Sequence, residues 1–264
     1  MERNILLTLQ YDGSNYAGWQ RQPASHGATV QQEVETALSQ VFREQIVVAG
    51  AGRTDSGVHA WGQRCSFRAH SSVPLEKLPD ILNRRLPGDI RVSRAEQVPD
   101  SFHARFTAHR KRYRYVLAQS GQANAFNHRY AWFLDGGLDL AAMQEGAAHL
   151  LGTHDFWHYT VSGVSASDFV RTISSLDVYA SEPQDCFFPW QELPSPILVE
   201  VEADGFLYKM VRIIVGRLVA VGQGRIPARA MADYLDGSFD LNIPPAPPQG
   251  LQLLWVRYAE AEAE

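Results

Sequence analysis

Hydrophobic and polar positions follow two different periods along the first third of the chain. Residues 4–11 alternate as a β-strand does, and apolar residues then recur at helical spacing from Val30 to Val41. Thr29, with Gln32 three residues later, forms the capping-box pattern that starts a helix. The remaining elements that the pattern predicts here are strands over 46–50, 63–69 and 90–98 and a helix over 75–86. This order, βαββαβ, is typical of a ferredoxin-like unit.

The second half of the chain repeats this order more loosely. Its pattern predicts strands over 113–118, 170–180, 197–203 and 251–258 and helices over 138–151 and 207–221. We therefore predict an α+β fold in which two ferredoxin-like halves, residues 1–105 and 106–264, join in one extended antiparallel sheet. Helices would cover one face of that sheet and leave a cleft on the other. Residues 181–195 are expected to form a long hairpin, and residues 244–248 a rigid linker into the last strand.

Composition narrows the class of protein. The 264 residues are 45% hydrophobic and 20% charged, which is the balance of a globular protein. No stretch approaches the roughly 20 apolar residues of a membrane span, and Gln10 and Asp12 end the apolar run near the start too early for a signal peptide. Cys65 and Cys186 are too far apart in the sequence to indicate a zinc knuckle. We expect a cytoplasmic protein with no membrane segment and no disulfide framework.

Charge is unevenly distributed along the chain. The net charge is −5, which argues against a polyanionic partner if the whole chain is averaged. Residues 102–134, however, contain no acid and six arginine or lysine residues, whereas residues 172–208 contain seven acids and no arginine or lysine. Aromatic residues occur among these cations at Phe102, Phe106, Tyr113 and Tyr115. Either the basic run is the solvated edge of a strand, or it binds single-stranded or flipped RNA bases beside their phosphates.

The segment 51–60, Ala-Gly-Arg-Thr-Asp-Ser-Gly-Val-His-Ala, contains the strongest candidate for catalysis. It lies between two predicted strands, and its two glycines allow a tight turn that presents Asp55 at the tip of a loop. An ordinary Asp-Ser-Gly turn would explain three of these residues. It would not explain why Arg53, Asp55 and His59 occur together in an otherwise apolar stretch.

A second candidate lies in the predicted helix over 207–221. Apolar residues cover nearly the whole circumference of this helix, so Arg212 is expected to be largely buried. A buried arginine needs a carboxylate or phosphate partner, because an unpaired buried charge is strongly destabilising. The alternative, in which Arg212 extends its side chain to the surface, agrees equally well with the periodicity. If Arg212 is buried, Asp55 is the partner that we predict.

Seven motifs occur along the chain in the order known from one enzyme family. They are Tyr11-Asp-Gly-x-x-Tyr-x-Gly-Trp-Gln20, Gly52-Arg-Thr-Asp-Ser-Gly-Val-His-Ala60, Phe102-His-Ala-Arg-Phe106, Tyr113-Arg-Tyr115, His154-Asp-Phe156, Val170-Arg-Thr-Ile173 and Gly205-Phe-Leu-Tyr-Lys-Met-Val-Arg-x-Ile-Val-Gly216. With these motifs the chain resembles the bacterial TruA family of tRNA pseudouridine synthases over nearly its whole length. It departs from the family at Trp157, His158 and Tyr159, where small hydroxyl residues and a phenylalanine are usual.

The resemblance implies an isomerase that converts uridine to pseudouridine at positions 38, 39 and 40 of the tRNA anticodon stem-loop, without a metal or an organic cofactor. Asp55 would be the nucleophile, Arg212 would keep it ionised, and Tyr113 would pack on the flipped base. Whether Asp55 attacks C1′ of the ribose or C6 of the base, or whether a glycal forms, stays open. The resemblance also implies a homodimer, and the predicted cleft would then bind RNA. The residues implied to contact the substrate or the RNA backbone are Arg53, His59, Arg105, Arg110, Lys111, Arg112, Tyr113 and Arg114.

Three other interpretations of these motifs are weaker. A binding or tRNA-folding module of the same fold that lacks activity would have no need of Asp55, Tyr113 and Arg212 together. The triplet 55–57, Asp-Ser-Gly, also matches aspartic proteases, but those enzymes need two copies and only one is present. Residues 154–158, His-Asp-Phe-Trp-His, resemble a zinc-binding His-Glu-x-x-His helix, but Gly152 indicates the end of a helix and no third ligand is apparent. We expect no metal.

Overall fold

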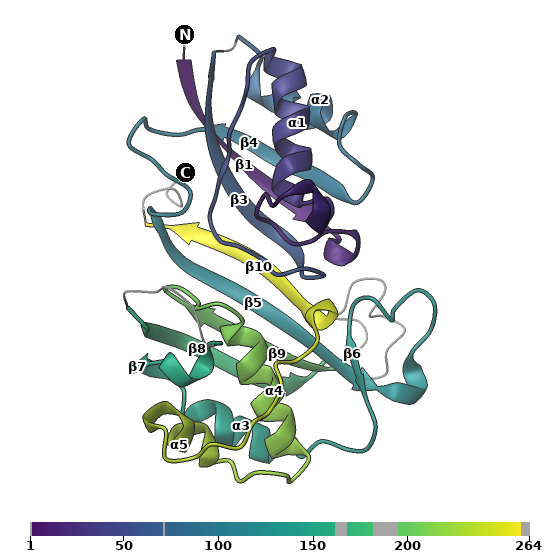
Figure 1. Cartoon of the computed structure of the whole chain (residues 1–264), viewed down its shortest axis with the longest axis vertical. Coiled ribbons are helices and arrows are strands. Elements are labelled where there is room, and N and C mark those ends of the chain that lie inside the picture. The colour runs from purple at the N-terminus through teal and green to yellow at the C-terminus, as the bar shows by residue number, and fades with distance from the viewer. Residues whose placement is uncertain (1, 71, 162–167, 182–194, 260–264) are drawn as a thin grey trace. The chain divides into compact units, whose positions relative to one another are not determined.

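The computed structural model describes residues 2–70, 72–161, 168–181 and 195–259. The chain forms two compact units (Figure 1). Unit 1 comprises Met1–Lys111 and Gln252–Glu264, and unit 2 comprises Arg112–Leu251. The sequence predicted a division between residues 105 and 106, with the last strand in the C-terminal half. In the structure, the contacts of residues 252–258 of that strand group them with unit 1. The predicted hairpin over 181–195 lies, apart from its two end residues, outside the described residues.

Unit 1 contains a mostly antiparallel sheet. Its strands are β1 (Glu2–Tyr11), β2 (Ala49–Gly50), β3 (His59–His70), β4 (Ile90–Gln97) and β10 (Leu251–Tyr258). The strand order is β4-β1-β3-β10, and β2 also pairs with β3. β1 lies antiparallel between β3 and β4, and β10 pairs with β3 in parallel through Gln252 and Leu253. From β1 to β4 the order of elements is the ferredoxin-like βαββαβ that the sequence predicted for the first half, and β10 adds one further strand to unit 1.

Two α-helices lie against the sheet of unit 1 (Figure 1). α1 (Val30–Phe42) begins where the sequence predicted, because the Thr29 side chain accepts a hydrogen bond from the Gln32 N–H. The apolar stripe of α1 is buried, as its helical spacing indicated. α2 (Leu78–Asn83) is shorter than the helix predicted over 75–86. The first turn of that predicted helix, Leu75–Lys77, forms a 3₁₀ helix instead.

Unit 2 contains further strands. They are β5 (Ala108–Gln119, whose first four residues belong to unit 1), β6 (Trp132–Leu134), β7 (Gly152–Asp155), β8 (Val170–Ala180) and β9 (Ile197–Ala203). Their order is β5-β9-β8-β7, and β6 pairs with β5 in parallel. β8 and β9 are antiparallel, with a bulge between Ile173 and Ser175. The sequence pattern missed β6 and β7, because runs of three and four residues are too short to show a period.

β7 excludes the zinc-helix interpretation of residues 154–158. His154 belongs to this strand and His158 to the 3₁₀ helix Trp157–Tyr159, so the two rings do not share one face of an α-helix. The Nε2 atom of His154 lies 2.8 Å from the carbonyl oxygen of Leu151. Throughout the part of the chain that the structure describes, no three His, Cys, Asp or Glu side chains are grouped so as to hold a metal ion.

The described part of unit 2 contains α3 (Leu140–Ala148), α4 (Met210–Gly222) and α5 (Ala230–Asp236). α3 begins after Asp139, whose side chain accepts a hydrogen bond from the Ala142 N–H. α4 begins later than predicted, because Lys209 adopts the left-handed conformation with φ of 59°. Every residue of α4 is buried except Arg212, which is partly exposed. The sequence pattern did not predict α5.

Each unit buries apolar residues from both its strands and its helices. Ile5 and Leu38 are fully buried in unit 1, and Met143 and Ile214 are fully buried in unit 2. The predicted α+β class with a mostly antiparallel sheet is therefore confirmed. No helix in the described ranges is long and apolar enough to cross a membrane.

Candidate active site

The loop between β2 and β3 buries some of its residues and exposes others. Ala51 and Thr54 are buried, whereas Arg53 is exposed and Asp55 is partly exposed. The buried residues are held by hydrogen bonds: the Ala51 N–H donates to the Arg64 carbonyl over 2.8 Å, and the Tyr11 hydroxyl lies 2.9 Å from the Thr54 hydroxyl. Because the backbone is fixed on both sides of Arg53, the side chains of Arg53 and Asp55 are presented from a rigid support.

The segment that follows β1 supports the other side of this loop. The Trp19 N–H donates to the Thr54 carbonyl over 3.0 Å, and the Gly57 N–H donates to the Tyr16 carbonyl over 3.4 Å. Gly18 has φ of 102°, and a Cβ atom at this position would lie 2.7 Å from the Thr54 carbonyl oxygen. Only glycine allows both this conformation and this close approach. The glycine before Trp19 in the first motif therefore serves the loop of Asp55.

Tyr11 and Gln63 form a buried polar pair beneath the loop. Gln63 donates to the Gly52 carbonyl over 2.9 Å and to the Tyr11 hydroxyl oxygen over 3.4 Å, which leaves the Tyr11 proton for Thr54. Burial raises the pKa of Tyr11 to about 12, so the phenol stays protonated at neutral pH. The sequence analysis did not single out Gln63, because its partners are close to it only in the folded chain.

His59 lies inside unit 1, with 7% of its surface exposed. Its Nδ1 accepts a hydrogen bond from the Gly13 N–H over 3.0 Å and lies 3.1 Å from an Asp12 oxygen. The ring thus supports the turn after β1, although the sequence analysis grouped His59 with the residues that contact RNA.

Lys111 also supports the loop of Asp55. Its Nζ donates to the Ala51 carbonyl over 2.7 Å, and a Cβ atom at position 52 would lie 3.3 Å from this nitrogen. The ammonium group therefore lies against the backbone that leads into Arg53. This contact with the loop differs from the contact with the RNA backbone that the resemblance implies for Lys111.

Three of the predicted RNA-binding arginines are exposed in unit 1. They are Arg53, Arg105 and Arg110. The Arg53 Nε donates to the Gln20 side chain over 3.2 Å, which orients the guanidinium without neutralising it. Guanidinium groups bind phosphates through charge-assisted hydrogen bonds.

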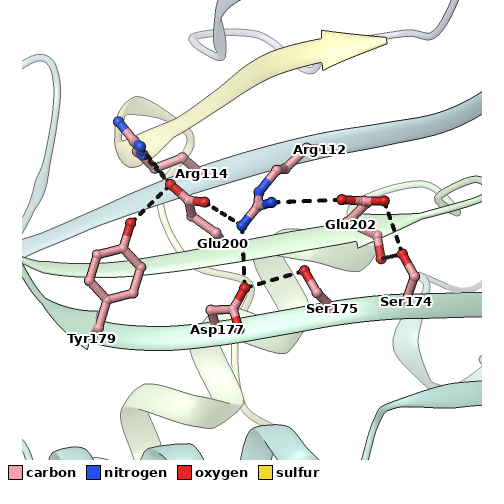
Figure 2. A network of polar contacts seen from close by, with 8 residues as sticks. All are labelled: Arg112, Arg114, Ser174, Ser175, Asp177, Tyr179, Glu200 and Glu202. Atoms are coloured by element: carbon pink, nitrogen blue, oxygen red, sulfur yellow. Dashed lines mark hydrogen bonds and ion pairs between the residues drawn. The ribbon is translucent and has the colours of Figure 1, made fainter. Parts of the chain in front are cut away.

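Arg112 and Arg114 belong to a network of ion pairs in unit 2 (Figure 2). Arg112 lies 2.7 Å from Glu200 and 3.3 Å from Asp177, and Arg114 lies 2.6 Å from the other oxygen of Glu200. The Tyr179 hydroxyl also donates to Glu200 over 3.1 Å. Glu200 is only 5% exposed, so these contacts compensate for the burial of its charge.

The network accounts for part of the segregation of basic and acidic residues along the sequence. The basic strand β5 and the acidic strand β9 are neighbours in the sheet, so their opposite charges meet across the strands. The sequence analysis assigned Arg112 and Arg114 to RNA and overlooked these carboxylate partners. In unit 2 both guanidinium groups already bind acids.

Tyr113 and Arg212 occupy different elements of unit 2. The Tyr113 ring is 7% exposed and meets the Phe206 ring edge-on at 5.1 Å. The Arg212 Nε donates to the Ala246 carbonyl over 2.7 Å, and the Ala246 N–H donates to the Arg212 carbonyl over 2.8 Å. This reciprocal pair fastens the proline-rich segment 244–248 to α4. Asp55 belongs to unit 1, so its pairing with Arg212 stays a prediction.

Arg217 is a buried cation that the sequence analysis missed. It is 9% exposed, and its guanidinium carbon lies 3.5 Å from the centre of the Tyr234 ring and 4.3 Å from that of Tyr159. Its Nη2 donates to the His158 carbonyl over 2.8 Å. Burial lowers the pKa of Arg217. Tyr159 is among the residues at which the chain departs from the family that it resembles.

Comparison with known proteins decides the family. A sequence profile described as tRNA pseudouridine synthase matches residues 8–107 and 147–259. The tRNA pseudouridine synthase A of Moorella thermoacetica is 43% identical over 96% of this chain and 99% of its own length. The proteins of the same name from Thermoanaerobacter pseudethanolicus and Geobacter sulfurreducens are 40% and 38% identical over 97% of this chain and 100% of their own length. The chain belongs to the tRNA pseudouridine synthase family. The predicted resemblance and the predicted enzyme class, an isomerase, are thereby confirmed.

The regions matched by the tRNA pseudouridine synthase profile include two of the three proposed catalytic residues. Asp55 lies in the first matched region and Arg212 in the second, whereas Lys111 and Tyr113 lie between the two regions. The roles proposed for Lys111 and Tyr113 therefore depend on their contacts in this chain, with Ala51 and Phe206 respectively, and not on the profile.

We expect Lys111→Met to lower the rate of pseudouridine formation about tenfold, because the buried Ala51 carbonyl loses its donor and the loop of Asp55 loses a support. Lys111→Arg keeps a charged donor and should restore most of the rate. Single-turnover kinetics on a tRNA transcript measure both. If Lys111 instead contacts a phosphate, Lys111→Met will lower the slope of log Kd against log salt concentration by about one and leave the single-turnover rate unchanged.

Proposed function

We propose that this enzyme isomerises uridines 38, 39 and 40 of the tRNA anticodon stem-loop to pseudouridine, with Asp55 as the nucleophile. The observation that carries the proposal is the construction of the loop, whose buried residues are fixed while Asp55 is partly exposed. A carboxylate that only completes a turn would not need a loop held by hydrogen bonds from Tyr11 of β1, Gln63 of β3 and Lys111 together. Activity at these positions is also what the resemblance to the TruA family implies.

The reaction needs a group that attacks and then leaves. The Asp55 carboxylate adds to C1′ of the ribose or to C6 of the base, and the bond between N1 and C1′ breaks. The uracil turns, C5 bonds to C1′, the bond between Asp55 and the substrate breaks so that the carboxylate is regenerated, the proton on C5 is lost and N1 gains a proton. One difficult exchange of a glycosidic bond is thereby divided into easier steps. No metal or organic cofactor takes part in this scheme.

The other proposed roles follow from the same scheme. Arg53, beside Asp55 on the loop, helps to extrude the uridine and fills the space that it leaves. Tyr113 packs on the extruded base, and Arg212 pairs with Asp55 and keeps it ionised. Arg105 and Arg110 contact phosphates without reading sequence. The enzyme acts in the cytoplasm as a homodimer.

Mapping of pseudouridine in an unmodified tRNA transcript tests the proposed function. The purified enzyme should modify uridines 38, 39 and 40, and transcripts with cytidine at these three positions should remain unmodified. Product elsewhere in the tRNA would contradict the proposed position. The main alternative is a module that binds tRNA without modifying it, and tight binding without product in any tRNA tested would favour it.

A further inference from the structure

Phe106 is the most exposed large apolar residue in the described part of the chain. Its side chain is 76% exposed, at a turn in unit 1 that precedes β5. Exposure of a single apolar side chain is common on protein surfaces. The turn that exposes Phe106 is, however, held in place by several hydrogen bonds, and this requires an explanation.

The turn is anchored to unit 1 at Ala104. This residue is fully buried: its N–H donates to the Ser66 hydroxyl over 3.0 Å, and its carbonyl accepts from the Tyr258 hydroxyl over 3.0 Å. Burial raises the pKa of Tyr258, so its hydroxyl remains a donor. Phe106 lies only two residues beyond this fixed point.

Further contacts fix both ends of the turn. The Asn4 side chain donates to the Phe102 carbonyl over 2.9 Å, and the Phe102 ring packs against Tyr258 at 4.8 Å. The Thr107 N–H donates to the His103 carbonyl over 3.0 Å, and the His103 N–H donates to the Thr107 hydroxyl over 3.1 Å. Phe106 therefore projects from a backbone that unit 1 holds on both sides.

Two polar side chains flank the exposed ring. The His103 ring lies 4.4 Å from the Phe106 ring at an angle of 31°, and the Arg105 guanidinium carbon lies 5.6 Å from its centre. We call His103, Arg105 and Phe106 the Phe106 platform. No acidic residue follows in the sequence until Asp135. The platform therefore combines an exposed aromatic face with a positive charge.

The structure separates Phe106 from three other aromatic residues of the basic segment, Phe102, Tyr113 and Tyr115. The sequence analysis considered Phe102, Phe106, Tyr113 and Tyr115 together as stacking surfaces. Phe102 packs on Tyr258, and Tyr113 and Tyr115 are 7% and 0% exposed. Of these four rings, Phe106 is the one with a large face open to a ligand.

We propose that the Phe106 platform stacks an unpaired nucleobase of the RNA substrate, at a nucleotide other than the uridine that reacts. Proteins bind unpaired bases with aromatic rings and arginine side chains placed beside phosphate contacts, which is the chemistry assembled here. A protein partner would instead be expected to need a broader apolar patch. This inference rests on the RNA-binding part of the proposed function and adds to it a specific contact.

The test compares variants of the exposed ring on the full-length enzyme. We expect Phe106→Ala and Phe106→Leu each to raise the Kd for a tRNA transcript about tenfold, and Phe106→Trp to keep the affinity, because only a flat ring stacks on a base. The matched control is Val47→Ala, which shortens the side chain of another exposed apolar residue in the same unit and should leave Kd unchanged. Fluorescence anisotropy at several salt concentrations measures Kd.

The dependence on salt and on RNA structure separates stacking from charge. Phe106→Ala should leave the slope of log Kd against log salt concentration unchanged, whereas Arg105→Gln should lower it by about one. The effect of Phe106→Ala should vanish on a blunt RNA duplex, which offers no unpaired base.

The proposed stacking would be wrong if Phe106→Ala and the wild type had equal Kd values for tRNA, or if Phe106→Ala lost as much affinity for the duplex as for tRNA. It would also be wrong if light scattering showed a lower molecular mass for Phe106→Ala than for the wild type, because Phe106 would then be a contact between subunits. Mapping of pseudouridine with the wild-type enzyme reports on the proposed function separately. If the wild type forms pseudouridine and Phe106→Ala binds tRNA normally, the platform alone is wrong.

Discussion

Asp55→Asn should lower the rate of pseudouridine formation at least about a thousandfold, because loss of the proposed nucleophile leaves only binding and orientation to promote the reaction. The amide is similar in size to the carboxylate, and Asp55 is partly exposed, so the fold and the tRNA affinity should change little. Single-turnover assays measure the rate, anisotropy measures the affinity, and thermal unfolding verifies the fold.

Two further variants make this test decisive. The amide of Asp55→Asn can hydrolyse back to a carboxylate and leave a small residual rate. Asp55→Ala has no amide, so its rate is free of this contribution. Asp100→Asn changes an exposed acid elsewhere in unit 1 and should keep the rate within about twofold. If both Asp55 variants retain more than a tenth of the wild-type rate, another group is the nucleophile.

The longer elements of the fold were predictable because their signals are local. The Thr29 cap and the apolar spacing after it placed the start of α1 correctly. The start of α4 was predicted too early, since apolar residues at helical spacing continue back to Leu207 while Lys209 adopts a left-handed conformation. A pattern of side chains does not reveal such a backbone angle.

The candidate site was predictable only in part. Arg53 and Asp55 lie next to a residue that the fold buries, and the motif of this loop is enough to indicate both residues as candidates. The roles of Arg112 and Arg114 were not visible, because their partner Glu200 lies more than 80 residues away in the sequence and meets them only when β5 and β9 pair. Segregated charge in a sequence therefore indicates either a polyanion site or two strands that neutralise one another.

Arg212→Met should lower the rate of pseudouridine formation about a hundredfold, because the cation that we propose as the partner of Asp55 is lost. The same variant removes the hydrogen bond to the Ala246 carbonyl, which should cost about 1 kcal/mol of unfolding free energy. Arg212→Lys should recover part of the rate only, since an ammonium group lacks the planar fork that can bind a carbonyl and a carboxylate together. Urea unfolding and single-turnover assays measure the two effects separately.

Arg217→Met is the matched control, because Arg217 lies on the same helix, is more deeply buried and contacts Tyr234 and Tyr159. We expect it to lower stability at least as much as Arg212→Met while the rate stays within about threefold. Added guanidinium ion at low concentration should restore activity to Arg212→Ala, which a purely structural role for Arg212 would not allow. If the rate falls in proportion to stability for both arginines, and guanidinium restores nothing, Arg212 only fastens residues 244–248 to α4 and another cation accompanies Asp55.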